Sequence, residues 1–155
     1  MNSILWTSQS LKVINTADTL TPEQRHRNMQ NIRSINTKPE CLVRKFLFSQ
    51  GFRYRKHDKR YPGRPDIVLP KYRTVIFVHG CFWHMHEGKS CFVMPKSNID
   101  YWKPKLERNR KRDAENIREL RAMGWNVIVI WECELKKSCR AVTLDNLVSC
   151  LHSLL

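Results

Sequence analysis

The chain has 155 residues, 41% hydrophobic and 27% charged, a composition that favours one globular domain and excludes a disordered chain. Lysine and arginine number 28 against 14 acidic residues, and the net charge of +14 predicts a polyanionic partner, nucleic acid before an anionic membrane. The longest apolar run, residues 75–78, is too short to cross a bilayer and residues 1–11 do not resemble a secretory signal, so we expect a cytoplasmic protein whose six cysteines do not form structural disulfides.

The N-terminal region predicts an arm followed by a helix. Residues 1–20 show no periodic pattern, and we expect a flexible arm ahead of a single domain, residues 21–155. Thr21 and Pro22 have the order of a helix cap and first turn, which predicts a helix over residues 21–35. This helix has few apolar side chains to bury, so we expect it to lie on a partner.

A second helix and three strands are expected next. Thr37 and Glu40 have the spacing of a capping box, which predicts a helix that ends at Gly51. The strands that the pattern predicts, separated by turns, are residues 52–55, 66–69 and 72–78.

The C-terminal half alternates between helix and strand. Residues 104–123 predict a strongly charged helix, residues 125–131 a buried strand and residues 143–154 a last amphipathic helix. Strands 72–78 and 125–131 are joined through a helix, so they should be parallel. The element order therefore predicts an α/β fold with a mixed sheet flanked by helices.

Five potential metal ligands occur in and after one loop. They are Cys81, His84, His86, Cys91 and Cys133. Thiolates and imidazoles are the ligands that zinc prefers, but a closed tetrahedral site takes four, so the spacing alone leaves one over. The alternative is a set of unrelated buried cysteines and a structural histidine.

An acid and two histidines are predicted at one edge of the sheet. Asp66 opens one strand and His79 ends the next, and antiparallel pairing brings such ends together. With His84 these groups could hold Mg²⁺ and move a proton from water. The competing explanation is that Asp66 caps a turn and His79 bonds a backbone carbonyl.

Aromatic and basic side chains alternate in the same region. Phe82 and Trp83 lie inside the metal loop, and Trp102 opens the charged helix. Such rings are either core or wedges that unstack a DNA step, and the sequence leaves both explanations open. Lys105 belongs to a basic run that forms a solvated helix face or contacts phosphates, and the net charge favours phosphates.

Taken together, these residues resemble the very short patch repair endonucleases. The similar stretches lie between about Arg25 and Leu135 and include Asn36-Thr37-Lys38-Pro39-Glu40, Pro62-Gly63-Arg64-Pro65-Asp66, His79-Gly80-Cys81-Phe82-Trp83-His84 and Trp131-Glu132-Cys133. The resemblance implies a restriction-endonuclease-like core, α-β-β-β-α-β, with a structural zinc loop. This core agrees with the element order above.

The resemblance also implies site residues. The implied catalytic residues are Asp66, His84, His79 and Glu40. Mg²⁺ would be held by Asp66 and the backbone carbonyl of Val78, and His84 would act on the attacking water. The implied ligands of a structural Zn²⁺ are Cys81, His86, Cys91 and Cys133. Four residues separate His86 from Cys91 where the family often has one, which leaves Glu87 as a weaker substitute ligand.

The implied substrate is double-stranded DNA that carries a T:G mismatch arising from deaminated 5-methylcytosine. The implied DNA-contacting residues are Met29, Ile32, Phe82, Trp83, Trp102, Lys105 and Asn109. A monomer acting in the cytoplasm, on the nucleoid, would cut 5′ to the thymine and leave a 5′-phosphate.

Two alternatives remain open on the sequence alone. A zinc-stabilised DNA-binding module without catalysis would explain the charge, the loop and the rings, but not why Asp66 faces His79. A related nuclease of the same core with another DNA substrate would explain all of these features. A zinc deaminase is disfavoured because its H-x-E and P-C-x-x-C signature is missing from the sequence.

Overall fold

The computed structural model describes residues 20–154. The chain divides into two compact units, Met1–Ile32 and Arg33–Leu155. The expected arm, residues 1–20, lies outside the described residues except for Leu20.

Helix α1 (Pro22–Gln30) belongs to the first unit. Thr21 caps it in a reciprocal capping box, in which the Thr21 hydroxyl accepts from the N–H of Gln24 and the Gln24 side chain accepts from the N–H of Thr21. The helix ends at Gln30 rather than at Ile35, because Asn31 closes it with bonds to earlier carbonyls. None of its residues is buried.

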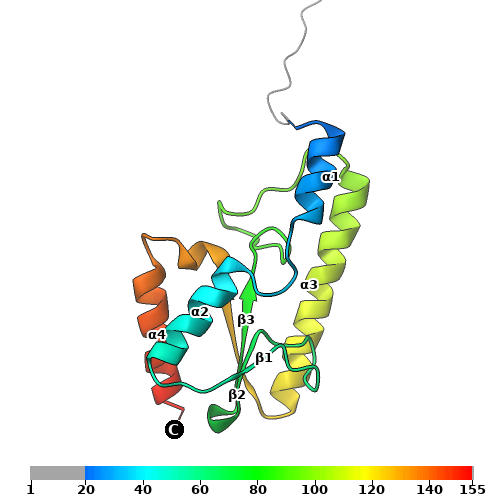
Figure 1. Ribbon diagram of the computed structural model, residues 1–155. Coiled ribbons are helices and arrows are strands. Elements are labelled where there is room, and N and C mark those ends of the chain that lie inside the picture. The colour runs from blue at the N-terminus through cyan, green and yellow to red at the C-terminus, as the bar shows by residue number, and fades with distance from the viewer. Residues whose placement is uncertain (1–19, 155) are drawn as a thin grey trace, which may run out of the picture. The chain divides into compact units, whose positions relative to one another are not determined.

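The second unit is built on a four-stranded sheet (Figure 1). Its strands, in spatial order, are β1 (Arg55–Lys56), β2 (Ile67–Leu69), β3 (Thr74–His79) and β4 (Asn126–Trp131). β1, β2 and β3 form an antiparallel meander, and β4 runs parallel to β3. The mixed sheet and the parallel crossover pair are therefore confirmed.

Helices cover both faces of this sheet (Figure 1). α2 (Lys38–Ser49) and α4 (Arg140–His152) lie on one face, and α3 (Ile99–Ala122) lies on the other. Successive side chains of β3 alternate between the two layers: Ile76 and Val78 join the α2–α4 core, whereas Val75 and Phe77 join the core that includes Leu120 of α3. Two short 3₁₀ helices, η1 (Pro70–Tyr72) and η2 (Glu132–Leu135), follow β2 and β4. Among the described residues, no helix combines the length and apolar character that crossing a membrane requires.

Three predicted features of the elements were wrong in detail. The charged helix was expected to begin at Pro104, because proline is favoured in a first turn. α3 instead begins at Ile99, and Pro104 lies inside it. β1 begins at Arg55, because Phe52 is buried in the core ahead of it. β4 was expected to be buried but is so only at Ile130, since the strand lies at an edge of the sheet.

Candidate functional site

Asp66 stands at the entry to β2 and is fixed to the end of β3. Its Oδ2 accepts a hydrogen bond of 2.7 Å from the backbone N–H of Val78. Burial raises the pKa of this carboxyl to about 6, the negative charge of Glu40 adds to the rise, and the Val78 N–H opposes it. A partly buried carboxylate that its surroundings stabilise poorly is suited to bind a cation.

The backbone carbonyl of Val78 faces the same edge. In a strand the N–H and C=O of one residue point the same way, and the Val78 N–H points to Asp66. Extending the β2–β3 register by two residues places Pro65 opposite Val78, and proline has no N–H to donate. A carbonyl and a carboxylate oxygen therefore come together where the ladder bonds end.

Glu40 is buried in the first turn of α2. One carboxylate oxygen accepts from the Thr37 hydroxyl at 2.8 Å and the other accepts from the N–H of Asn36 at 2.9 Å. Thr37 caps the helix as predicted, but Glu40 reaches the Thr37 hydroxyl and the N–H of Asn36, where a capping box would use the N–H of Thr37. The cap thus orients a carboxylate on the buried face of the helix.

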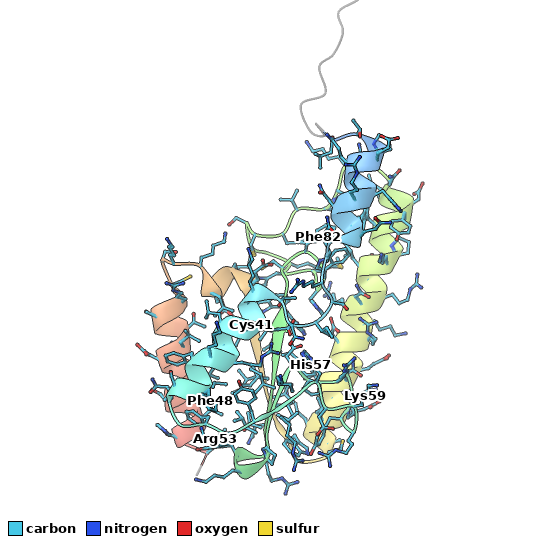
Figure 2. All side chains as sticks on the ribbon, viewed as in Figure 1. Cys41, Phe48, Arg53, His57, Lys59 and Phe82 are labelled. Carbon is cyan, nitrogen blue, oxygen red and sulfur yellow. The ribbon has the colours of Figure 1, made fainter. Side chains whose placement is uncertain are left out.

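Two residues near these carboxylates were missed by the sequence analysis. His57 directly follows β1 (Figure 2), and its ring nitrogens lie 3.4 Å from Glu40 Oε2 and 3.7 Å from Asp66 Oδ1. Arg44, one turn after Glu40, bonds the Glu40 carboxylate at 3.4 Å. Ligand atoms of Glu40, His57 and Asp66 lie within 4.8 Å of one another, close enough to hold a metal ion.

A second group is formed by two histidines and an acid from α3. His79 ends β3, and its ring stacks on that of His84 with centroids 3.9 Å apart and planes at 4°. Nδ1 of His84 lies 2.5 Å from Oδ2 of Asp113. Burial, and then the nearby His84, lower the pKa of His79 to about 4, so its ring is neutral at neutral pH.

The two groups adjoin each other. Val78, which bonds Asp66, precedes His79 directly in β3, and the charge of His84 lowers the pKa of Asp66. The four predicted catalytic residues are therefore gathered at one end of the sheet. This arrangement is the one that the sequence analysis expected for Asp66, His79 and His84.

Asp113 was missed although the sequence carries a signal for it. Leu106, Ile117 and Leu120 follow the apolar stripe of α3 at helical spacing. Asn109 and Asp113 occupy stripe positions between them, where an apolar residue would be expected. Polar residues on the packed face of a helix are candidates for a site.

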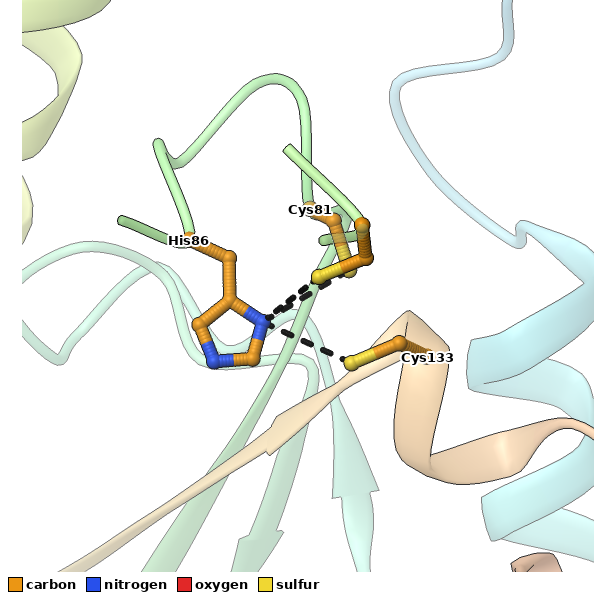
Figure 3. A group of neighbouring side chains, drawn as sticks. Cys81, His86 and Cys133 are labelled. Atoms are coloured by element: carbon orange, nitrogen blue, oxygen red, sulfur yellow. Dashed lines mark hydrogen bonds between the residues drawn. The ribbon is translucent and has the colours of Figure 1, made fainter. Parts of the chain in front are cut away.

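A cluster of three cysteines and one histidine lies beyond the end of β3 (Figure 3). Nδ1 of His86 is 3.8 Å from the sulfur of Cys81, 3.2 Å from that of Cys91 and 3.4 Å from that of Cys133. His84 takes no part in this group, and Glu87 instead pairs with Arg110. The geometry thus selects the predicted four residues from the five candidates, including Cys91 despite its longer spacing.

The chemistry of the four side chains fits a metal ion. Burial, together with the neighbouring thiols, raises the pKa of Cys133, and burial also raises that of Cys81. Ionised thiols crowded in this way repel one another unless a cation lies between them. The His86 ring also stacks on Trp131 with centroids 3.9 Å apart, which fixes its orientation.

The aromatic residues form one cluster beside the metal loop. Phe82 and Trp102 have centroids 5.3 Å apart, and Phe82 and Trp83 have centroids 5.1 Å apart. Lys105 Nζ lies over the rings of Tyr101, Trp83 and Trp102. The three predicted wedge rings are half-buried, so they are neither a closed core nor free side chains.

The remaining predicted DNA contacts fall in two places. Asn109 donates a hydrogen bond of 3.2 Å to the Trp83 carbonyl, which ties α3 to the aromatic loop. Met29 and Ile32 are exposed and belong to the first unit.

Comparison with known proteins gives consistent matches. The family described as DNA mismatch endonuclease Vsr matches residues 17–91. The chain is 57% identical over 119 residues to a type II nicking enzyme of Neisseria meningitidis serogroup A, an alignment that covers 77% of this chain and 84% of that protein. It is 54% identical over 118 residues to a type II nicking enzyme of Xanthomonas oryzae pv. oryzae, covering 76% and 86%. It is 39% identical over 120 residues to the DNA mismatch endonuclease Vsr of Escherichia coli K12, covering 77% and 76%.

Proposed function

Because the chain belongs to the Vsr family of DNA mismatch endonucleases, we propose that it nicks one strand of double-stranded DNA 5′ to the thymine of a T:G mismatch. The chain is a DNA-cleaving hydrolase with a restriction-endonuclease-like fold. The observation that carries the proposal is the Asp66 carboxylate, bound to Val78 and adjacent to the stacked pair of His79 and His84. T:G pairs of this kind arise when 5-methylcytosine loses its amino group.

Two metal ions fit the residues present. Asp66 and the Val78 carbonyl would hold Mg²⁺, because hard cations prefer oxygen ligands, and the bound ion would polarise a phosphate oxygen. Cys81, His86, Cys91 and Cys133 would hold Zn²⁺ in a closed tetrahedral site. Three thiolates and one imidazole leave no open position, so that site is structural.

The histidines and Asp113 supply the proton transfer. Asp113 holds the His84 ring by Nδ1, and the other ring nitrogen, Nε2, takes a proton from the attacking water. The water oxygen attacks phosphorus and the bond from phosphorus to the 3′ oxygen breaks. The leaving 3′ oxygen takes a proton from solvent, which leaves a 3′-hydroxyl and a 5′-phosphate. His79, neutral and stacked on His84, keeps that ring in place, and it would contact the phosphate of the bound DNA.

The aromatic cluster would recognise the mismatch. Phe82, Trp83 and Trp102 would wedge into the duplex from the major groove, and Met29 of α1 together with Ile32, just after that helix, would contact the minor groove. Opening a wobble pair costs less than opening a matched pair, so a wedge favours T:G. One copy of the chain supplies every group for an asymmetric nick, and we propose that it acts as a monomer.

A strand-labelled cleavage assay tests the proposal. Duplexes of one sequence carrying T:G, T:A or C:G at one position are incubated with Mg²⁺, and without it. We expect one nick, in the thymine strand of the T:G duplex alone, with a 5′-phosphate. Asp66→Asn should abolish it, and Asp145→Asn, an exposed acid on α4, should not.

A second candidate function is nicking of one DNA strand without a requirement for a T:G mismatch. It has its own support, since two of the relatives are named type II nicking enzymes. Under that alternative, the same assay would nick the matched duplexes as readily as the T:G duplex. A T:G preference below about twofold would therefore favour the second candidate.

A further inference from the structure

His57 lies between two carboxylates of the site. Its side chain is 10% exposed, with Nε2 3.4 Å from Glu40 Oε2 and Nδ1 3.7 Å from Asp66 Oδ1. A histidine placed in this way either ligates a cation or orients the carboxylates that do. Its neighbours decide between these two roles.

Arg44 determines which nitrogen of His57 carries the proton. Nη1 of Arg44 lies 3.2 Å from His57 Nε2. A guanidinium has donors and no acceptor, so this contact is favourable only if Nε2 offers its lone pair. The contact is shorter than the 3.4 Å between Nε2 and Glu40 Oε2, and that carboxylate oxygen already pairs with Arg44. The proton of the neutral ring then lies on Nδ1, the nitrogen that faces Asp66.

The buried network holds Arg44 itself in place. Its other terminal nitrogen, Nη2, donates to Asn36 Oδ1 at 2.8 Å, and Nη1 also pairs with Glu40 at 3.4 Å. Arg44 is buried, so these partners fix the guanidinium in one orientation.

The sheet places His57 opposite Asp66. Lys56 pairs with Ile67 in the β1–β2 ladder, so the next residue outward on each strand is His57 and Asp66. The His57 carbonyl accepts from Arg64 Nε at 3.2 Å, which anchors the backbone at its positive φ of 46°. The position of the ring therefore follows from the strand register.

We propose that His57, with its proton kept on Nδ1 by Arg44, is a positioning residue that orients Asp66 for cation binding without ligating the cation. Asp66 Oδ2 is fixed by a hydrogen bond from the Val78 N–H, and Nδ1 of His57 faces the other oxygen at 3.7 Å, an electrostatic contact longer than a hydrogen bond, so the two contacts together limit rotation of the carboxylate. Neither nitrogen of His57 has a lone pair available for a metal. The inference rests on the proposed function, because it assigns Asp66 to the cation.

Two substitutions separate the roles. His57→Ala removes the ring, whereas His57→Asn keeps a donor near the place of Nδ1 and tolerates a positive φ. Binding of Mn²⁺, a probe of the Mg²⁺ site, is followed by electron paramagnetic resonance on the zinc-loaded, DNA-free protein. Nicking of the T:G duplex is measured over a range of Mg²⁺ concentrations, and Asp145→Asn is the control.

We expect His57→Ala to weaken Mn²⁺ binding by about tenfold and to raise the Mg²⁺ concentration for half-maximal nicking by a similar factor, with the rate at saturating Mg²⁺ changed much less. His57→Asn should restore both values to within about threefold of the parent protein. A fall in the saturating rate with unchanged Mn²⁺ affinity would overturn the proposal. So would a His57→Asn variant that restores neither value, because that result makes the imidazole ring itself a ligand.

Failure of the proposed function would look different. If Asp66→Asn binds Mn²⁺ as tightly as the parent protein, Asp66 is not the cation ligand and both proposals fail. If the parent protein does not nick the T:G duplex, but His57→Ala still binds Mn²⁺ more weakly than the parent, the positioning role stands and the proposed substrate is wrong.

Discussion

At the scale of single residues, Asp66 illustrates a conflict between stability and function. Its pKa in the folded protein is raised from 3.8 to about 6, chiefly by burial. The folded protein therefore binds this proton more tightly than the unfolded chain does, so stability falls as the pH rises from 3.8 to about 6, and the full cost is present above 6. Below 3.8 both states are protonated, and the cost disappears.

Asp66→Asn should stabilise the protein in magnesium-free buffer. The amide removes the buried charge and keeps an oxygen for the Val78 N–H, so we expect the free energy of unfolding at pH 7.5 to rise by about 1–3 kcal/mol. The gain should shrink as the pH falls from 6 to 4. Urea unfolding of the variant and the parent at pH 7.5 and at pH 4 measures this difference in free energy. A variant less stable than the parent at pH 7.5 would contradict the assigned burial cost.

Asp113→Asn tests the residue that holds His84. An amide at this position can favour the wrong tautomer of the imidazole, and we expect the nicking rate at saturating Mg²⁺ to fall by about 10²-fold or more. Binding of the T:G duplex without Mg²⁺ should remain close to that of the parent protein. A rate within twofold of the parent would remove Asp113 from the proton transfer.

Sequence reasoning identified some of these residues and missed others for physical reasons. Asp66 and His79 could be paired because antiparallel strands bring such ends together whatever the rest of the fold does. Asp113 could not be paired with His84, since the register of α3 against a loop is set by tertiary packing. His57 was missed because β1 was placed at residues 52–55, which hid the register that sets His57 opposite Asp66.

At the scale of elements, the loop between β3 and α3 depends on the cysteine cluster. Residues 80–98 contain little regular structure, yet this loop carries both His84 and the cluster residues Cys81 and His86. A bound metal would therefore fix His84, the proposed catalytic histidine, through the backbone that the two sites share.

Cys133→Ser should lose zinc, stability and activity together. Removing one of four ligands opens the site, and we expect less than half the parent zinc content and a melting temperature lower by about 5–15 °C. The nicking rate should fall because His84 is displaced. Cys150→Ser, an exposed thiol on α4, is the control, and an unchanged zinc content in Cys133→Ser would show that Cys133 is not a ligand.

The turn before Asp66 is packed against α3 through a glycine. Gly63 has a φ of 71°, and a Cβ built there would lie 2.8 Å from Nδ2 of Asn116. We expect Gly63→Ala to cost about 2 kcal/mol, in part from the backbone and in part from the contact. Asn116→Ala removes the Nδ2 and Cγ contacts and keeps only Cβ at 3.0 Å, so it relieves part of the contact and none of the backbone cost. Thermal unfolding of the double variant should therefore show a loss smaller than the sum of the single losses. Strictly additive losses would mean that Asn116 is not the obstacle.

Element types were easier to predict than element limits. Thr37 fixed the start of α2, because an N-cap is a local interaction between neighbouring residues. Pro104 misled the prediction of α3, since proline favours a first turn but its lost hydrogen bond is tolerated in a helix that packing stabilises. Edge exposure of β4 could not be known before the strand order was.

At the scale of the whole molecule, charge and shape recognition make different contributions to DNA binding. The net charge of +14 predicts strong attraction to phosphates in any sequence, and exposed basic residues such as Lys103, Arg108 and Lys111 lie on α3. The aromatic cluster at the start of the same helix carries no net charge of its own, so it would discriminate between base pairs without adding to the salt dependence.

This division can be measured with two variants. Affinities for T:G and C:G duplexes are determined by fluorescence anisotropy without Mg²⁺ at several salt concentrations. Arg108→Gln should lower the magnitude of the slope of log affinity against log salt by about one, because one phosphate contact releases about one counterion. It should weaken binding to the T:G and C:G duplexes by the same factor. Trp102→Ala should leave the slope unchanged and reduce the ratio of the affinity for T:G to that for C:G, because the wedge acts on the base step. If Trp102→Ala weakened binding to both duplexes by the same factor, the rings would serve as a structural core. Mismatch recognition would then have to come from another part of the protein.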